Sequence, residues 1–233
     1  MSMKSESTSD MLKQIHPRFG ARLDSIPVRP GVHTGRGFFF RESLKSLSVT
    51  ASLFPSSRFL ASALLRPIDF ERAQVIVELG MGTGAITTEI LRRMAPGSIL
   101  FAIEVNPAFI AHVRSKVHDS RLVPIAGRAE RLGSILGKRG VRHADAIVSS
   151  LGLTSMAHEQ RASIVGQAAE HLGENGVLTQ YQYLPASAKP KWVRALGPKR
   201  FAEENFLRQY FREVRSERVI WNLPPARVYT CRP

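Results

Sequence analysis

The chain has 233 residues, enough for one α/β domain with an extension, and its 33 Lys and Arg against 19 Asp and Glu give a net charge of +14. Such a charge favours polyanionic partners, either nucleic acid or the anionic head groups of a bilayer. One cysteine, Cys231, excludes an internal disulfide and fits a reducing compartment. Since the sequence has no run of eighteen apolar residues and no signal-peptide pattern, we expect any membrane contact to be peripheral.

The first seventy residues predict a leader followed by two helices. Residues 1–36 are polar and interrupted by Pro and Gly, which predicts a flexible leader. Beyond it, apolar residues recur at steps of four and three, the spacing of one stripe of an amphipathic helix: Phe40, Leu44, Leu47, Ala51 and Phe54. The stripe fits either packing on the domain or burial in a lipid interface. Pro55 ends this helix, residues 58–65 predict a second one, and we assign 37–70 to these helices and 71–233 to the main domain.

Residues 71–233 alternate strand and helix patterns, as expected of a doubly wound sheet. Apolar runs predict five parallel strands, at 75–79, 99–104, 122–126, 144–149 and 177–183. The helix predicted over 158–172 should close with a left-handed stop at Gly173 and at Asn175 with Gly176. Two last strands, 214–221 and 226–231, form a hairpin. The predicted fold is therefore α/β and Rossmann-like: a mostly parallel seven-stranded sheet whose last strand is antiparallel, with an N-terminal helical extension.

The stretch Val75–Leu91 combines a buried strand, a glycine turn and a helix start, which is a nucleotide-binding unit by geometry. Its turn alternates three glycines with two larger residues: Gly80, Met81, Gly82, Thr83 and Gly84. The same string fits the loose dinucleotide fingerprint, with Ala85 at the third small position. Charge separates the two ligands, because a pyrophosphate disfavours a nearby carboxylate, whereas Glu78 precedes the turn and Glu104 ends the next strand. Two acids favour S-adenosylmethionine, which carries a sulfonium and an ammonium and whose ribose hydroxyls Glu104 can accept.

Five segments, in order, resemble the bacterial phospholipid N-methyltransferases, the phosphatidylethanolamine N-methyltransferase family among the class I S-adenosylmethionine-dependent methyltransferases. They are PSSRFLA (55–61), VELGMGTG (77–84), VSSLGL (148–153), LTQYQYLP (178–185) and NLPPARVY (222–229). The resemblance covers most of residues 38–233. It implies a class I fold in 71–233, S-adenosylmethionine as methyl donor and an amino phospholipid as acceptor. It further implies a bacterial cytoplasmic enzyme that binds the anionic inner face of the cytoplasmic membrane reversibly, through its N-terminal helix.

The resemblance and the glycine turn together assign the donor site to the following residues: Glu78, Gly80, Met81, Gly82, Thr83, Gly84, Glu104, Val105, Arg128, Ala129 and Ser149. Two departures from the family pattern matter. Gly127-Arg128-Ala129 replaces a common Gly-Asp-Ala, so the backbone of that loop has to replace a carboxylate at the adenine amino group. Ser150-Leu151-Gly152 replaces a usual Gly-Leu-Pro, which leaves the acceptor open between phosphatidylethanolamine, an ornithine lipid and another amino lipid.

The acceptor site is expected at the carboxyl end of the fifth strand. Tyr183 and Tyr181 could orient or desolvate the amine there, with Ser149 and Asn222 as polar neighbours, or the tyrosines could only pack the sheet edge. Lipid contacts are assigned to the apolar stripe (Phe40, Leu44, Leu47 and Phe54) and to the basic residues Lys189, Lys191, Arg194, Lys199 and Arg200. No histidine stands at ligand spacing with a cysteine or a second histidine, so we expect no metal site.

The competing class is the ribosomal RNA adenine dimethylases, which share the glycine turn and also suit a basic chain. They place Asn-Leu-Pro-Tyr or a close variant after the fourth strand, where the aromatic ring stacks on the target base. Residues 149–152 contain no aromatic side chain, so we expect no stable nucleic-acid partner. A third class is a membrane-binding module without catalysis.

Overall fold

The computed structural model describes residues 56–184 and 203–233. The predicted leader and the apolar stripe of Phe40, Leu44, Leu47, Ala51 and Phe54 lie outside the described residues. So do the basic lipid-binding candidates Lys189, Lys191, Arg194, Lys199 and Arg200.

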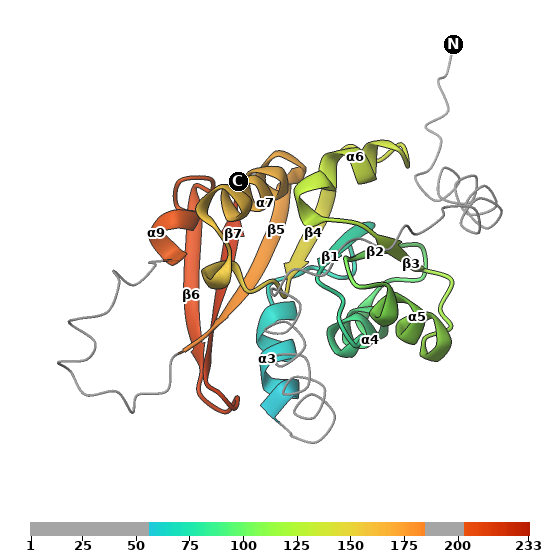
Figure 1. Ribbon diagram of the computed structural model, residues 1–233, viewed down its shortest axis with the longest axis horizontal. Helices are drawn as coiled ribbons and strands as arrows, with labels where there is room; N and C mark the ends of the chain where they lie inside the picture. The colour runs from blue at the N-terminus through green and yellow to red at the C-terminus, as the bar shows by residue number, and fades with distance from the viewer. Residues whose placement is uncertain (1–55, 185–202) are drawn as a thin grey trace, which may run out of the picture. The chain divides into compact units, whose positions relative to one another are not determined.

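A seven-stranded sheet of order β3-β2-β1-β4-β5-β7-β6 forms the centre of the described part (Figure 1). Its strands are β1 (Val75–Leu79), β2 (Ile99–Glu104), β3 (Leu122–Ala126), β4 (Ala144–Ser149), β5 (Leu172–Tyr183), β6 (Glu213–Val219) and β7 (Ala226–Arg232). Strands β1 to β5 pair in parallel, and β7 lies antiparallel between β5 and β6. This arrangement confirms the predicted sheet with its antiparallel last strand.

Helices cover both faces of the sheet (Figure 1). One face carries α3 (Ser56–Leu65), α4 (Ala85–Arg93) and α5 (Pro107–Lys116), and the other carries α6 (Leu132–Gly137), α7 (His158–Glu170) and α9 (Glu203–Leu207). Strands β1 and β2 are nearly all buried because helices pack on both their sides, which explains their continuous apolar runs. On the α3 face, Leu64 and Ile90 pack with Ile76 and Val148 in one apolar cluster. No described helix is long and apolar enough to cross a bilayer.

The predicted left-handed stop of the helix before the fifth strand is wrong. Helix α7 ends at Glu170, and β5 begins at Leu172, five residues before the predicted start. Leu172 pairs with Ala144 and Val177 with Ala146, so residues 173–176 form a bulge within the strand. Neither Gly173 nor Gly176 has a positive φ, because the sheet holds this segment in an extended conformation.

Candidate active site

The glycine turn joins β1 to α4 with all three glycines at positive φ: 84° for Gly80, 53° for Gly82 and 86° for Gly84. A Cβ on Gly84 would lie 2.9 Å from Val113 Cγ2, and one on Gly80 would lie 3.0 Å from Leu151 Cδ2. Nothing lies within 4 Å of the corresponding position on Gly82. The outer two glycines are therefore needed for packing as well as for backbone conformation, whereas Gly82 borders open space where a ligand can approach the backbone.

Glu78 is fully buried beneath this turn. Its Oε2 accepts a hydrogen bond from Thr87 Oγ1 at 2.7 Å, and its Oε1 has no partner in the described structure. Burial raises the pKa of Glu78 to about 8, since the Thr87 hydrogen bond offsets only part of the lost solvation and Glu104 adds repulsion. A buried carboxyl with one unsatisfied oxygen fits a cationic ligand group, which would favour its ionised form.

Glu104 links the end of β2 to the glycine turn. Its Oε2 accepts from the Gly82 backbone amide at 3.0 Å, and its Oε1 accepts from the amides of Val105 and Asn106, both at 2.9 Å. An ionised carboxylate has about four acceptor positions, so the protein itself fills three of them. One position remains for a ligand hydroxyl, and a second hydroxyl would have to replace one of the protein's own amides.

The residues predicted to line the adenine lie beside Glu104. The amide of Gly127 donates to the backbone oxygen of Glu104 at 3.0 Å, and Val105 is 56% exposed next to it. Ala129 is buried at the start of the short helix η1 (Ala129–Arg131). The side chain of Arg128 turns to Glu130 instead, with Nη2 donating to Oε1 at 2.8 Å.

Glu130 in η1 and Gln160 on α7 adjoin the predicted adenine loop and were not predicted from the sequence. Burial opposes ionisation of Glu130, but hydrogen bonds from its own backbone, Arg128 and Gln160 outweigh it and hold the pKa of Glu130 below its usual value. The amide of Gln160 on α7 donates to the same Oε1 at 2.9 Å. The spacing of Arg128 and Glu130 hints at the local pair, whereas the contact with Gln160 joins residues thirty positions apart.

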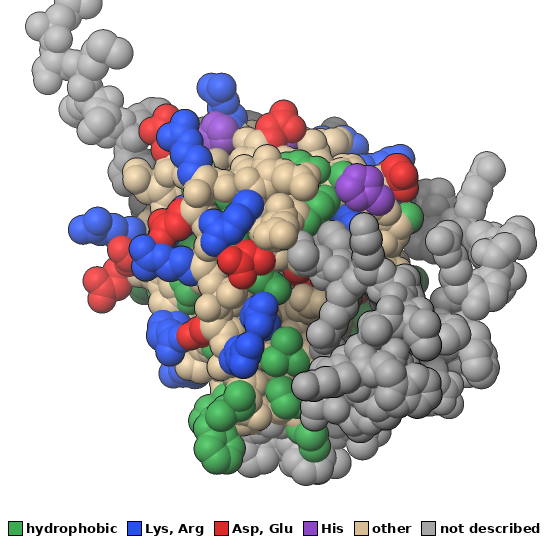
Figure 2. All heavy atoms as spheres, turned by 90° about the vertical axis from the view of Figure 1, so that its left-hand side faces the viewer, with side chains coloured by type: hydrophobic (Ala, Val, Ile, Leu, Met, Phe, Trp, Pro, Cys, Tyr) green, Lys and Arg blue, Asp and Glu red, His purple; other side chains and the backbone are tan. Residues whose placement is uncertain are grey.

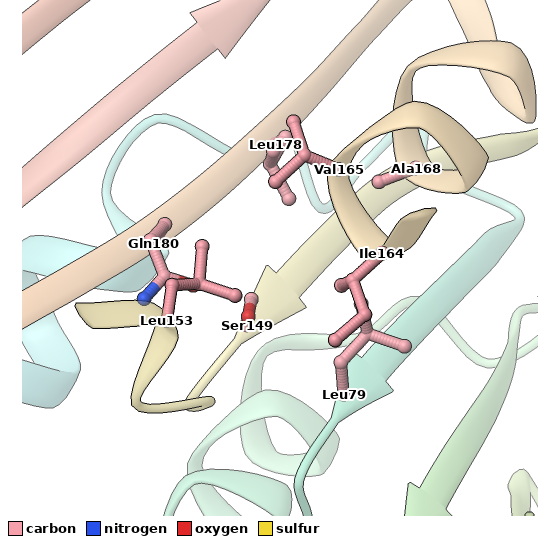
Figure 3. A pocket seen from close by; sticks show the side chains of 8 residues that line it. All are labelled: Leu79, Ser149, Leu153, Ile164, Val165, Ala168, Leu178 and Gln180. Atoms are coloured by element: carbon pink, nitrogen blue, oxygen red, sulfur yellow. The ribbon is translucent and has the colours of Figure 1, made fainter. Parts of the chain in front are cut away.

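The four predicted catalytic residues do not lie together. Ser149 is buried on the α7 face of the sheet, in a small and mostly apolar pocket shown in Figure 3 and lined by Leu79, Ser149, Leu153, Ile164, Val165, Ala168, Leu178 and Gln180. Tyr181 and Tyr183 pack on the opposite face, against the cluster that includes α3. Asn222 lies in the β6–β7 turn, where its Nδ2 donates to the backbone oxygen of Pro224 at 2.7 Å.

Tyr181 and Tyr183 form an edge-to-face pair, with ring centroids 5.1 Å apart and planes at 71°. Burial, aided by the neighbouring Tyr183, raises the pKa of Tyr181 far above its usual value. Tyr181 is therefore a neutral phenol at physiological pH. It can donate or accept a hydrogen bond, but it is no base.

The sheet order and the acid-flanked glycine turn define the class: this is the fold of the class I S-adenosylmethionine-dependent methyltransferases. The chain is similar to 1,6-didemethyltoxoflavin-N1-methyltransferase of Burkholderia thailandensis, solved with S-adenosylhomocysteine (16% identity, 90% of this chain and 96% of that one, TM-score 0.57). It is also similar to human N-acetylserotonin methyltransferase in complex with S-adenosylmethionine (14%, 83% and 55%, TM-score 0.56). Identities this low support the fold alone.

Sequence similarity supplies the family. The chain is 32% identical over 195 residues to an ornithine lipid N-methyltransferase of Singulisphaera acidiphila, a match that covers 83% of this chain and 94% of that protein. The chain therefore belongs to the family of that enzyme. No protein-family model matches the chain.

Proposed function

We propose that the protein is an S-adenosylmethionine-dependent N-methyltransferase of a membrane amino lipid, with ornithine lipid as the first candidate and phosphatidylethanolamine as the second. The observation that supports this order is the 32% identity to an ornithine lipid N-methyltransferase across 94% of its length. That relative moves ornithine lipid ahead of phosphatidylethanolamine, the acceptor expected first from the sequence.

The residues at the ends of β1 and β2 fit the donor. The ligand ammonium would meet the unsatisfied oxygen of Glu78, and the remaining acceptor position of Glu104 would take a ribose hydroxyl. Open space at Gly82 allows a ligand to approach the backbone. When bound, S-adenosylmethionine supplies a methyl group activated by the sulfonium.

The acceptor amine has to be held as a free base, because a protonated amine has no lone pair to donate. In the sheet register Glu78 is beside Val148 and Val148 is beside Thr179, so these side chains share one face with Tyr181 and Tyr183 further along β5. Thr179 Oγ1 is buried without a partner in the described structure. We assign amine orientation to the two phenols on this face. Ser149, on the other face, and Asn222, in the turn, would act by supporting the strand ends.

Radiolabelled methyl transfer tests the proposal. The purified protein should label ornithine lipid in vesicles, phosphatidylethanolamine more weakly, and ribosomal RNA not at all. Tyr183→Phe and Tyr181→Phe should slow lipid methylation by about 10- to 100-fold, the range of lost positioning. Tyr210→Phe, a phenol packed against Phe206 on the α9 side, is the matched control and should leave the rate unchanged. Label in RNA, or in neither lipid, would contradict the proposal.

A further inference from the structure

The β6–β7 turn carries the three most exposed large apolar side chains of the described structure. Ile220 is 64% exposed, Trp221 is 72% exposed and Leu223 is 65% exposed, all within residues 220–225. Asn222 points inward and bonds to Pro224, so the turn holds its apolar side chains outward rather than folding over them. Figure 2 shows hydrophobic side chains gathered at the lower end of this face. Three large exposed side chains in one turn form a patch, which distinguishes them from scattered surface residues.

Positive charge adjoins this patch. Arg218 and Arg227 are direct partners in the β6–β7 register, one step before the turn, and residues 218–227 contain no acid. Like charges directly opposite in a sheet destabilise the pair. In Figure 2, basic side chains lie just above the apolar end, with acidic side chains interspersed. Arg227 is half-buried, and its charge already helps to lower the pKa of Glu204, whereas Arg218 is exposed. Arg218 can therefore meet an anionic surface, and the charge pattern favours an acidic partner for the turn.

The patch lies beside the carboxyl end of β5, the end of the sheet that carries the candidate active site. Strand β7 begins at Ala226, which pairs with Tyr183 at the end of β5. The amide of Leu184 also donates to the backbone oxygen of Pro225 at 2.7 Å. The turn is therefore continuous with the strand end that holds Tyr181 and Tyr183, and a surface bound by the turn would face the acceptor site.

We propose that the β6–β7 turn is a membrane-docking element: Ile220, Trp221 and Leu223 enter the interfacial layer of an anionic phospholipid bilayer while the exposed Arg218 binds its head groups. An exposed Trp beside aliphatic side chains and arginines is the composition that suits this layer. This inference rests on the proposed lipid substrate, because docking here would present lipid head groups to Tyr181 and Tyr183. It is independent of the apolar stripe predicted near the N-terminus.

Vesicle binding by the full chain tests this element. Vesicles of phosphatidylcholine, with and without phosphatidylglycerol, are mixed with protein carrying Trp192→Phe, so that Trp221 is the only tryptophan. The Trp221 emission should shift to shorter wavelength with anionic vesicles, and salt should weaken the shift. Trp221→Ala and Leu223→Glu should each lower binding by about tenfold or more. Both variants should bind S-adenosylhomocysteine normally, which shows that they are folded.

A matched pair of arginines tests the charge. Arg218→Glu should weaken binding to anionic vesicles several-fold and leave neutral vesicles nearly unaffected. Arg142→Glu makes the same change of charge at an exposed site just before the central strand β4. This site lies at the amino end of the parallel strands, away from the turn, and the variant should keep binding within about twofold.

Three results have distinct meanings. Unchanged vesicle binding in Trp221→Ala, or an unshifted Trp221 emission, would overturn the docking element. A loss of self-association in Trp221→Ala with vesicle binding intact would also overturn it, since the turn would then contact a second copy. Trp221-dependent binding without methylation of any amino lipid would support the docking element and contradict the proposed enzyme function instead.

Discussion

Replacing Glu78 by Gln should stabilise the ligand-free protein, and the gain should grow as the pH rises from about 4.5 to about 8. Burial raises the pKa of Glu78 from 4.5 to about 8, so the folded protein holds this proton more tightly than the unfolded chain does. Stability that depends on the bound proton is complete below the unfolded pKa and is lost as the pH rises through the folded pKa. Gln keeps the shape of the protonated acid at every pH and avoids this loss.

The size of the effect follows from the same values. The shift is 8 − 4.5 = 3.5 pH units. At 1.36 kcal/mol per unit, the Glu78→Gln protein should gain about 3 kcal/mol over the wild type at pH 6.5 and about 5 kcal/mol above pH 8. At pH 5 the two proteins should differ by less than about 1 kcal/mol.

Urea unfolding followed by circular dichroism at pH 5, 6.5 and 8 measures this difference. Glu71→Gln, an exposed carboxylate, is the control and should change little at any pH. Saturating S-adenosylhomocysteine should reduce the advantage of Glu78→Gln, because its ammonium would pair with the ionised carboxylate of the wild type. A difference between the proteins that does not vary with pH would refute the reasoning.

Three further experiments test other parts of the chain. In titration calorimetry, Glu104→Ala should weaken S-adenosylhomocysteine binding by roughly 1.5–3 kcal/mol, the range for hydrogen bonds to a charged group. Unchanged affinity, or a preference for a nicotinamide dinucleotide, would contradict the donor assignment. Gly82→Ala should cost roughly 1–2 kcal/mol of stability through its positive φ. Gly84→Ala should cost roughly 1–3 kcal/mol more, because its Cβ also meets Val113. Equal shifts of the melting temperature in the two variants would show that the contact with Val113 relaxes freely. Leu47→Glu should abolish flotation with anionic vesicles if the predicted apolar stripe binds lipid. Ser48→Glu, on the polar side of the same predicted helix, is the control and should not. Equal flotation of the two variants would contradict lipid binding by the stripe.

Strands were predictable where burial on both faces leaves a simple pattern. The predicted bounds of β1 to β4 agree with the structure because each is a short apolar run between turn residues. The start of β5 was missed because Gly173 and Gly176 are typical of helix stops, and only pairing with Ala144 and Ala146 holds them in the sheet. The short helices α6 and α9 were missed because five or six residues carry too little periodicity.

The candidate site was predictable along each strand but not across strands. Glu78 and Glu104 could be placed beside the glycine turn because each lies next to a turn whose geometry is local. The placement of Ser149 on the face opposite Tyr181 depends on the pairing of Ser149 with Gln180. The register between two strands cannot be predicted from the sequence of either strand alone. The exposed apolar turn at 220–225 was likewise not predictable, because its sequence alone does not show which side chains are exposed.

The two outer strands determine how copies of this protein can meet. Strand β3 carries Pro124, which cannot donate a hydrogen bond to a further strand, and β6 alternates Glu213, Arg215 and Glu217 with smaller side chains. An outer strand with proline or closely spaced charges resists the addition of another strand. Many copies of the protein could therefore bind side by side on one surface without their sheets joining edge to edge. A high local concentration should not lead to aggregation through these strands.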